Sequence, residues 1–119
     1  MKIRFIEPGN RPYKPTPLNY FVYDRYIRTP SVGLNTLATI VKKKYKDTLM
    51  YSESISRIPL DDILDADVIF IGIFTFAAVR GYKIARFLKK RSKAVIVLGG
   101  LHASMNYKEA VRFCDYVLL

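Results

Sequence analysis

The residues best placed to do chemistry follow an apolar run at 94–98 and read Gly99-Gly100-Leu101-His102-Ala103-Ser104. Two glycines directly after a buried strand let the backbone approach a bulky ligand closely or adopt a positive φ. His102 and Ser104 then offer polar anchors beside the glycines. The alternative is a tight turn from strand to helix in which Ser104 caps the helix. The pattern favours ligand contact and leaves the turn interpretation open.

Three other side chains are candidates for chemistry. Thr75 follows the apolar run at 68–74, where its hydroxyl can face a ligand or cap a helix that begins at Ala77. His102 is the only histidine, and one histidine without a second protein ligand makes a poor metal site. Cys114 is the only cysteine, which excludes an internal disulfide and predicts a small buried hydrophobic residue. No nucleophile–base or carboxylate pair stands out at the strand ends, so we predict no catalytic residue and no metal ligand.

The elements that must position these residues alternate between strands and helices. Strands are predicted at 2–6, 48–51, 68–74, 94–98 and 115–119, and helices at 30–45, 59–64, 77–91 and 107–112. Continuous apolar runs without alternation are typical of parallel strands that are covered on both faces. The chain therefore predicts an α/β fold, a doubly wound parallel five-stranded sheet in the flavodoxin-like (Rossmann-like) order 2-1-3-4-5. Ligands of such folds bind outside the carboxyl ends of the strands.

Several ligand classes of this fold lack their motifs here. The chain has no G-x-G-x-x-G, no G-x-x-x-x-G-K-[ST] and no Ser/Thr/Gly-rich loop after the first strand. Phe74 and Thr75 stand where a phosphoacceptor aspartate would end the third strand. These absences argue against dinucleotide, flavodoxin and receiver functions.

The segment from Glu7 to Thr29 is long, irregular and rich in proline and tyrosine. Loops of this length are uncommon inside a compact domain and are usually functional or disordered. The aromatic residues favour a packed, functional loop.

Length and composition set the class of protein. The 119 residues predict one domain spanning 1–119, and 50% hydrophobic with 25% charged residues is ordinary globular composition. No apolar run approaches the ~20 residues of a membrane span, and the N-terminus does not resemble a signal peptide. We therefore expect a cytoplasmic protein.

The net charge of +10 suggests a second possible function. Basic residues cluster at 42–46 and 80–93, and clustered cations bind nucleic acid by releasing counterions. However, both clusters thicken toward predicted helix C-termini, where cations stabilise the helix dipole. We favour solvated helix faces or an acidic partner domain. The alternative is a basic interaction or nucleic-acid-binding module with the same fold and no cofactor.

From about residue 29 onward, the chain resembles the cobalamin (B12)-binding domain N-terminal to the radical SAM core in B12-dependent radical SAM proteins. Residues 30–38, Pro-x-x-Gly-Leu-x-x-Leu-Ala, look like the opening of that family's first helix. Residues 67–73 followed by Thr75 are similar to its central strand and ligand loop. The most specific match is the run 95–104, close to the family's V-x-G-G-x-H-x-[ST]. Residues 115–117 match a strand that in the family continues into a Gly-Glu-Gly-Glu turn, which is missing here.

The resemblance implies that cobalamin lies across the carboxyl edge of the sheet, with its nucleotide tail between the strand-end loops. It assigns cofactor-binding roles to Pro30, Gly33, Thr75, Phe76, Gly99, Gly100, Leu101, His102 and Ser104. The chain lacks the D-x-H-x-x-G sequence of other B12 domains, as the family generally does, which implies cobalt without a protein histidine ligand. If a ligand packs at Gly100, Gly100→Val should weaken binding more than it harms folding, whereas a positive-φ turn predicts damage to the fold.

A radical SAM core holds its [4Fe-4S] cluster with three cysteines in C-x-x-x-C-x-x-C, and this chain has one cysteine. The resemblance therefore implies that S-adenosylmethionine, the cluster and the reaction belong to a C-terminal radical SAM domain of a longer parent enzyme. The chain stops on Leu118-Leu119 within a predicted strand, which leads us to expect a truncated piece. The expected partners are cobalamin and that radical SAM domain.

Overall fold

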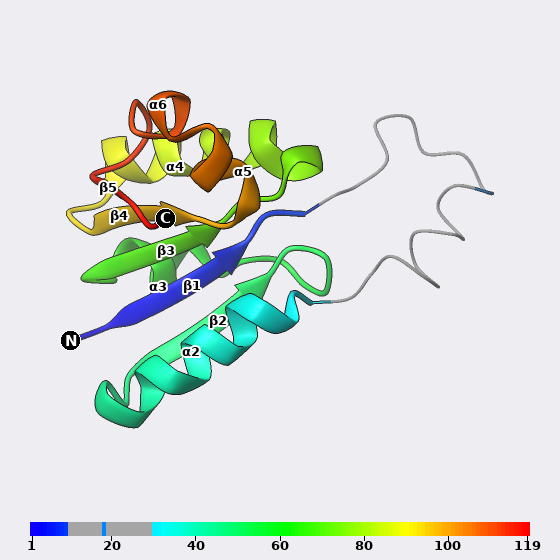
Figure 1. Cartoon of the computed structure of the whole chain (residues 1–119). Coiled ribbons are helices and arrows are strands. Elements are labelled where there is room, and N and C mark those ends of the chain that lie inside the picture. The colour runs from blue at the N-terminus through cyan, green and yellow to red at the C-terminus, as the bar shows by residue number, and fades with distance from the viewer. Residues whose placement is uncertain (10–17, 19–29) are drawn as a thin grey trace.

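The computed structural model describes residues 1–9, 18 and 30–119. Within these residues, one parallel sheet has the strand order β2-β1-β3-β4-β5 (Figure 1). The strands are β1 (Ile3–Glu7), β2 (Thr48–Ser52), β3 (Val68–Gly72), β4 (Val95–Gly99) and β5 (Tyr116–Val117). The predicted flavodoxin-like α/β fold is confirmed.

Helices cover both faces of the sheet, and they are distributed unequally in the described part of the chain (Figure 1). On one face lies α2 (Val32–Lys44). On the other lie α3 (Leu60–Leu64), the 3₁₀ turn η2 (Thr75–Ala77), α4 (Ala78–Arg91), α5 (Leu101–Met105) and α6 (Tyr107–Ala110). The sheet is therefore the middle layer of three.

The face of the sheet under α4 holds the larger core. Ile69, Ile71, Ile96 and Leu98 project from β3 and β4 to this side, and all are fully buried. Helix α4 meets them with Ala78, Gly81, Ala85 and Leu88, which recur every three or four residues as a helix face requires. Burying each large apolar side chain contributes roughly 1.5–3 kcal/mol.

The described residues cover the face under α2 only in part. Phe5 stacks on Phe70 with ring centroids 4.7 Å apart, and both pack beneath Ala38 of α2. Farther along the sheet, Val95 and Tyr116 project to this face and are 38% and 65% exposed. The prediction of strands covered on both faces is therefore wrong for β4 and β5, because α2 packs over β1, β2 and β3.

The edges of several elements differ from those predicted. Helix α4 begins after η2, and the region 101–112 folds into α5 and α6 instead of a single helix at 107–112. Strand β3 ends at Gly72, and the last bond of its ladder with β4 runs from the Ile73 N–H to Gly99 O at 2.8 Å. The predicted functional loop at 7–29 falls mostly outside the described residues.

Cys114 is buried, as predicted, and burial raises the pKa of its thiol. In the described ranges, no helix is both long and apolar enough to cross a membrane.

Candidate functional site

Strands β1, β3 and β4 end side by side at the carboxyl edge of the sheet, and the loops after β3 and β4 meet there (Figure 1). Gly72 and Gly99 are register partners at the ends of β3 and β4. Between these glycines and the start of α2 lies a mainly apolar groove of about 210 Å³, called here the α2 groove. Its walls include Glu7, Ser31, Gly33, Leu34, Leu37, Phe70, Gly72, Gly99, Gly100 and Leu118.

The start of α2 forms one wall of the groove. Ser31 is the N-cap, and its Oγ accepts a hydrogen bond from the Leu34 N–H at 3.3 Å. Gly33 in the first turn is exposed, and a Cβ built there would come no closer than 4.0 Å to a neighbouring atom, Ser31 Oγ. Neither packing against the described residues nor backbone φ therefore requires glycine at 33, although glycine costs about 1 kcal/mol relative to alanine inside a helix.

Gly99 forms the opposite wall. A Cβ at Gly99 would lie 3.5 Å from the Leu118 Cβ, which is an ordinary contact distance, and its φ is not positive. At Gly72 a Cβ would lie 3.2 Å from a Leu34 methyl group, which is tighter. Gly33 and Gly99 thus keep open a space that the fold itself would let a methyl group occupy.

Gly100 has a different role. Its φ is +95°, and a Cβ there would lie 2.8 Å from Ile73 O and 2.9 Å from Ile73 N. The turn is closed by the His102 N–H, which donates to Ile73 O at 3.1 Å. The tight-turn interpretation is confirmed at Gly100, so damage to the fold is expected from Gly100→Val. The expectation that Ser104 caps the following helix is wrong, because Ser104 lies within α5 and no side chain caps that helix.

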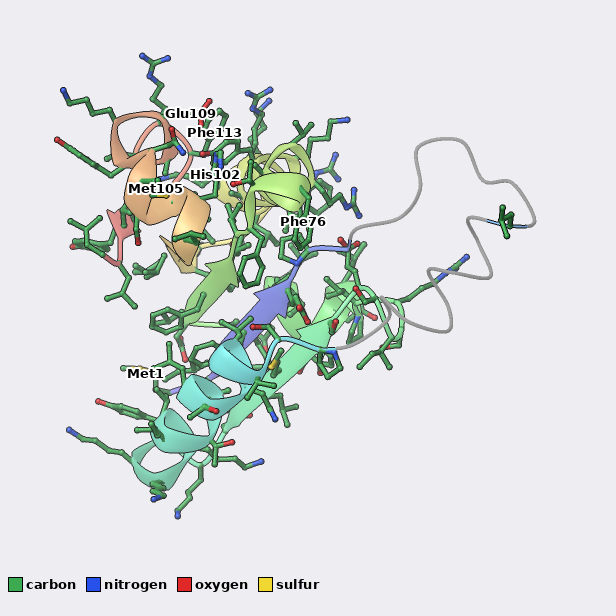
Figure 2. All side chains as sticks on the ribbon, turned by 45° about the vertical axis from the view of Figure 1, so that its right-hand side comes forward. Met1, Phe76, His102, Met105, Glu109 and Phe113 are labelled. Carbon is green, nitrogen blue, oxygen red and sulfur yellow. The ribbon has the colours of Figure 1, made fainter. Side chains whose placement is uncertain are left out.

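His102 joins two loops of this edge. Its Nδ1 lies 3.3 Å from Thr75 Oγ1 and its Nε2 lies 3.2 Å from Glu109 Oε2 (Figure 2). Thr75 does not cap α4, which starts at Ala78 without a side-chain cap, so that alternative is wrong. The Tyr82 hydroxyl donates to Glu109 Oε2 at 3.0 Å, and this bond, with His102, lowers the pKa of the Glu109 carboxyl.

Exposed apolar side chains surround this region. Phe76 is 67% exposed, and Leu101 and Met105 are also exposed. Figure 2 shows Phe76 on one side of His102 and Met105 on the other. Phe76 stacks on Phe74 with ring centroids 5.6 Å apart. Clustered exposed apolar side chains are typical of ligand or partner surfaces.

The structure thus brings Gly33, Gly99 and Gly100 to one groove and places Thr75, Phe76, Leu101, His102 and Ser104 on the adjoining loops and helix. Pro30 is exposed just before the N-cap of α2. In the part of the chain that the structure describes, no three His, Cys, Asp or Glu side chains are grouped to hold a metal ion.

Sequence reasoning missed Glu7, which ends β1 and lines the α2 groove with 8% of its surface exposed. Its signal was an acidic residue at the carboxyl end of a strand, where ligands of this fold class bind.

Fold and site together define a flavodoxin-like α/β protein with an apolar, glycine-walled groove at the carboxyl edge of its sheet. Among curated proteins, a stretch of 55 residues is 44% identical to bacteriochlorophyllide d C-8(2)-methyltransferase of Chlorobaculum tepidum. The match covers 46% of this chain but only 12% of the methyltransferase. No family model matches the chain, and no solved structure matches it significantly.

Proposed function

We propose that this chain is the cobalamin-binding domain of a B12-dependent radical SAM enzyme of the iron–sulfur oxidoreductase or methyltransferase type. The α2 groove carries the proposal, because Gly33 and Gly99 leave unfilled space that neither the fold nor the backbone requires. The motif resemblance of residues 30–38 and 95–104 supports the same ligand. The stretch shared with part of a methyltransferase supports a parent enzyme that transfers methyl groups.

The dimensions and chemistry of the groove fit part of cobalamin. Pockets that enclose drug-sized ligands have volumes of roughly 300–1,000 Å³, so a groove of about 210 Å³ can enclose only a fraction of this cofactor. Leu34, Leu37 and Phe70 give it an apolar lining that suits the flat benzimidazole of the nucleotide tail. The corrin would then rest on the exposed apolar rim beside Phe76 and Leu101.

The predicted contact residues take different parts in this arrangement. Gly33 and Gly99 give the tail room, and Gly100 shapes the turn beside it. Thr75 is exposed at the rim, and the His102 ring links Thr75 to Glu109 of α6. Both ring nitrogens of His102 face partners within the chain, which supports a cobalt without a ligand from this histidine. Bound cobalamin would supply a carrier for a methyl group.

The chain itself is not catalytic in this proposal. S-adenosylmethionine and the [4Fe-4S] cluster would bind to the radical SAM domain of the parent chain. The exposed apolar rim would face that domain across the corrin.

The proposal is tested by titrating the folded protein with hydroxocobalamin, followed by absorbance and by calorimetry. Saturable one-to-one binding is expected. Gly33→Ala should weaken it about tenfold, equivalent to about 1.4 kcal/mol, because the new methyl group occupies the groove. The same variant should be up to about 1 kcal/mol more stable without ligand, so that lost binding is not lost folding.

Thr36→Ala is the matched control, because Thr36 is exposed on the same helix and is not among the residues that line the α2 groove. Its affinity should equal that of the wild type. Absence of binding to a wild-type protein that circular dichroism shows to be folded would refute the proposal. Unchanged affinity of Gly33→Ala would remove the groove from the site.

A further inference from the structure

The α2 groove contains an acidic side chain with one oxygen that the described part of the fold leaves without a hydrogen-bond partner. Glu7 ends β1, lines the groove and is 92% buried, since 8% of its surface is exposed. Its Oε2 is buried and has no hydrogen-bond partner among the described residues. Burying a carboxylate without partners is costly, and folded proteins retain few such groups. An exception that faces a groove is a candidate for ligand recognition.

The neighbouring strand adds a second unsatisfied polar atom. Ser52 on β2 is the register partner of Glu7, and side chains of partners in a parallel sheet lie on the same face. Ser52 is 7% exposed, and its Oγ also lacks a partner among the described residues. Two buried oxygens without partners therefore belong to adjacent strand ends.

Another buried charge in the same strand shows that the fold can satisfy such a group. Arg4 is 3% exposed, and its guanidinium forms ion pairs with Asp62 and Asp47. It also donates to the carbonyl oxygens of Ile3 and Asp47, both at 2.9 Å. Glu7 lies three residues further along β1, and its Oε2 has no partner among the described residues.

Building on the proposed function, we propose that Glu7 accepts a hydrogen bond from an N–H or O–H donor of the bound ligand. In cobalamin such donors are the carboxamides of the corrin periphery and the ribose hydroxyls of the nucleotide tail. The rest of the groove is mainly apolar, so one buried acceptor would fix the orientation of the ligand. A hydrogen bond from the ligand would offset the free-energy cost of burying the Glu7 side chain.

The test is Glu7→Gln, which keeps the shape of the side chain but removes its charge and replaces one acceptor with a donor. Hydrogen bonds to charged groups are the stronger class, so the affinity for hydroxocobalamin should fall about tenfold or more. The melting temperature of the ligand-free variant should be equal to or above that of the wild type. Asp61→Asn is the control, because Asp61 is an exposed carboxylate on α3 outside the groove. Its affinity should be unchanged.

Cobinamide, which has the amides but no nucleotide tail, separates the two donor sources. Weakened binding of cobalamin alone assigns the donor to the tail, whereas equal weakening of both ligands assigns it to a corrin amide. Unchanged affinity of Glu7→Gln would overturn the inference while leaving the proposed function intact.

A large fall in the melting temperature of the ligand-free Glu7→Gln variant would make Glu7 a structural residue and would also overturn the inference. If wild-type protein binds no cobalamin, the proposed function fails. The melting temperature of ligand-free Glu7→Gln then decides separately about Glu7. A large fall means that Glu7 stabilises the fold, and no fall means that Glu7 can bind a different ligand that carries a donor.

Discussion

At the scale of single residues, the glycines of the candidate site have different roles. Gly100 is required by the fold, because its φ of +95° and the backbone of Ile73 leave no place for a side chain. Gly33 and Gly99 have space for a Cβ and therefore point to room kept for a ligand. A mutation at Gly100 consequently tests the fold, and mutations at the other two glycines test the proposed ligand site.

We expect Gly100→Ala to lower the free energy of unfolding by about 1–3 kcal/mol, because the new Cβ is strained at positive φ and lies 2.8 Å from Ile73 O. Urea unfolding measures this loss. Gly99→Ala is the control and should be neutral or slightly stabilising, since alanine costs less backbone entropy than glycine in a strand. Equal stability of Gly100→Ala and the wild type would contradict the turn geometry.

At the scale of elements, α3 depends on its contacts with the sheet. A helix of five residues is too short to be stable alone. Its Asp62 forms ion pairs with Lys2 and Arg4, and it accepts a hydrogen bond from the Tyr51 hydroxyl at 2.7 Å. The bond from Arg4 is the main reason that the pKa of the Asp62 carboxyl lies well below its usual range. This network ties α3 to β1 and β2.

Asp62→Asn should lower the free energy of unfolding by about 3 kcal/mol, because Arg4 stays buried without its main partner. The wild type should also lose stability in acid. The folded-state pKa of Asp62 is lowered, so its contribution is complete above the unfolded value of about 3.9 and declines as the pH falls below it. Urea unfolding at neutral and acidic pH measures both effects.

The acid-induced loss of stability should be smaller in Asp62→Asn than in the wild type, and parallel pH profiles would contradict this assignment. Asp65→Asn is the control. Its ion pair with Lys2 is exposed, so a change of at most about 1 kcal/mol is expected.

At the scale of the whole molecule, clusters of basic residues lie away from the groove. Helices α2 and α4 both begin at the carboxyl edge of the sheet and run back toward its amino edge (Figure 1). Their last turns carry residues 42–44 and 89–91, on opposite faces of the sheet. These two basic clusters therefore lie apart from the α2 groove, and the proposed function and its alternative can be tested independently.

Lys43→Gln should leave the affinity for cobalamin unchanged, and that affinity should vary little between about 50 and 200 mM salt, because the groove is mainly apolar. A nucleic-acid-binding module predicts the opposite behaviour. It would bind RNA or DNA with a steep dependence on salt and would weaken when Lys42, Lys43 and Lys44 are neutralised together. Calorimetry with cobalamin and fluorescence anisotropy with labelled oligonucleotides separate the two. Strong salt-dependent oligonucleotide binding without cobalamin binding would favour the alternative function.

The sheet order and main helices follow from the sequence because their signals are local. The β-branched runs at 68–73 and 95–98 specify buried strands, and the helical spacing of apolar residues specifies α2 and α4. Right-handed crossovers then restrict the order of the strands. The short elements η2 and α5 were missed, since three and five residues are too few to show a helical period.

The sequence alone also placed the candidate site at the carboxyl edge and named the loops that form it. Which residue does what there was decided only by the tertiary structure. The lack of space for a side chain at Gly100, the pairing of Thr75 with His102 and the unsatisfied Oε2 of Glu7 all depend on groups far apart in the chain. Local patterns determine which segments become strands and helices. The free space and the unpaired atoms exist only after those segments pack.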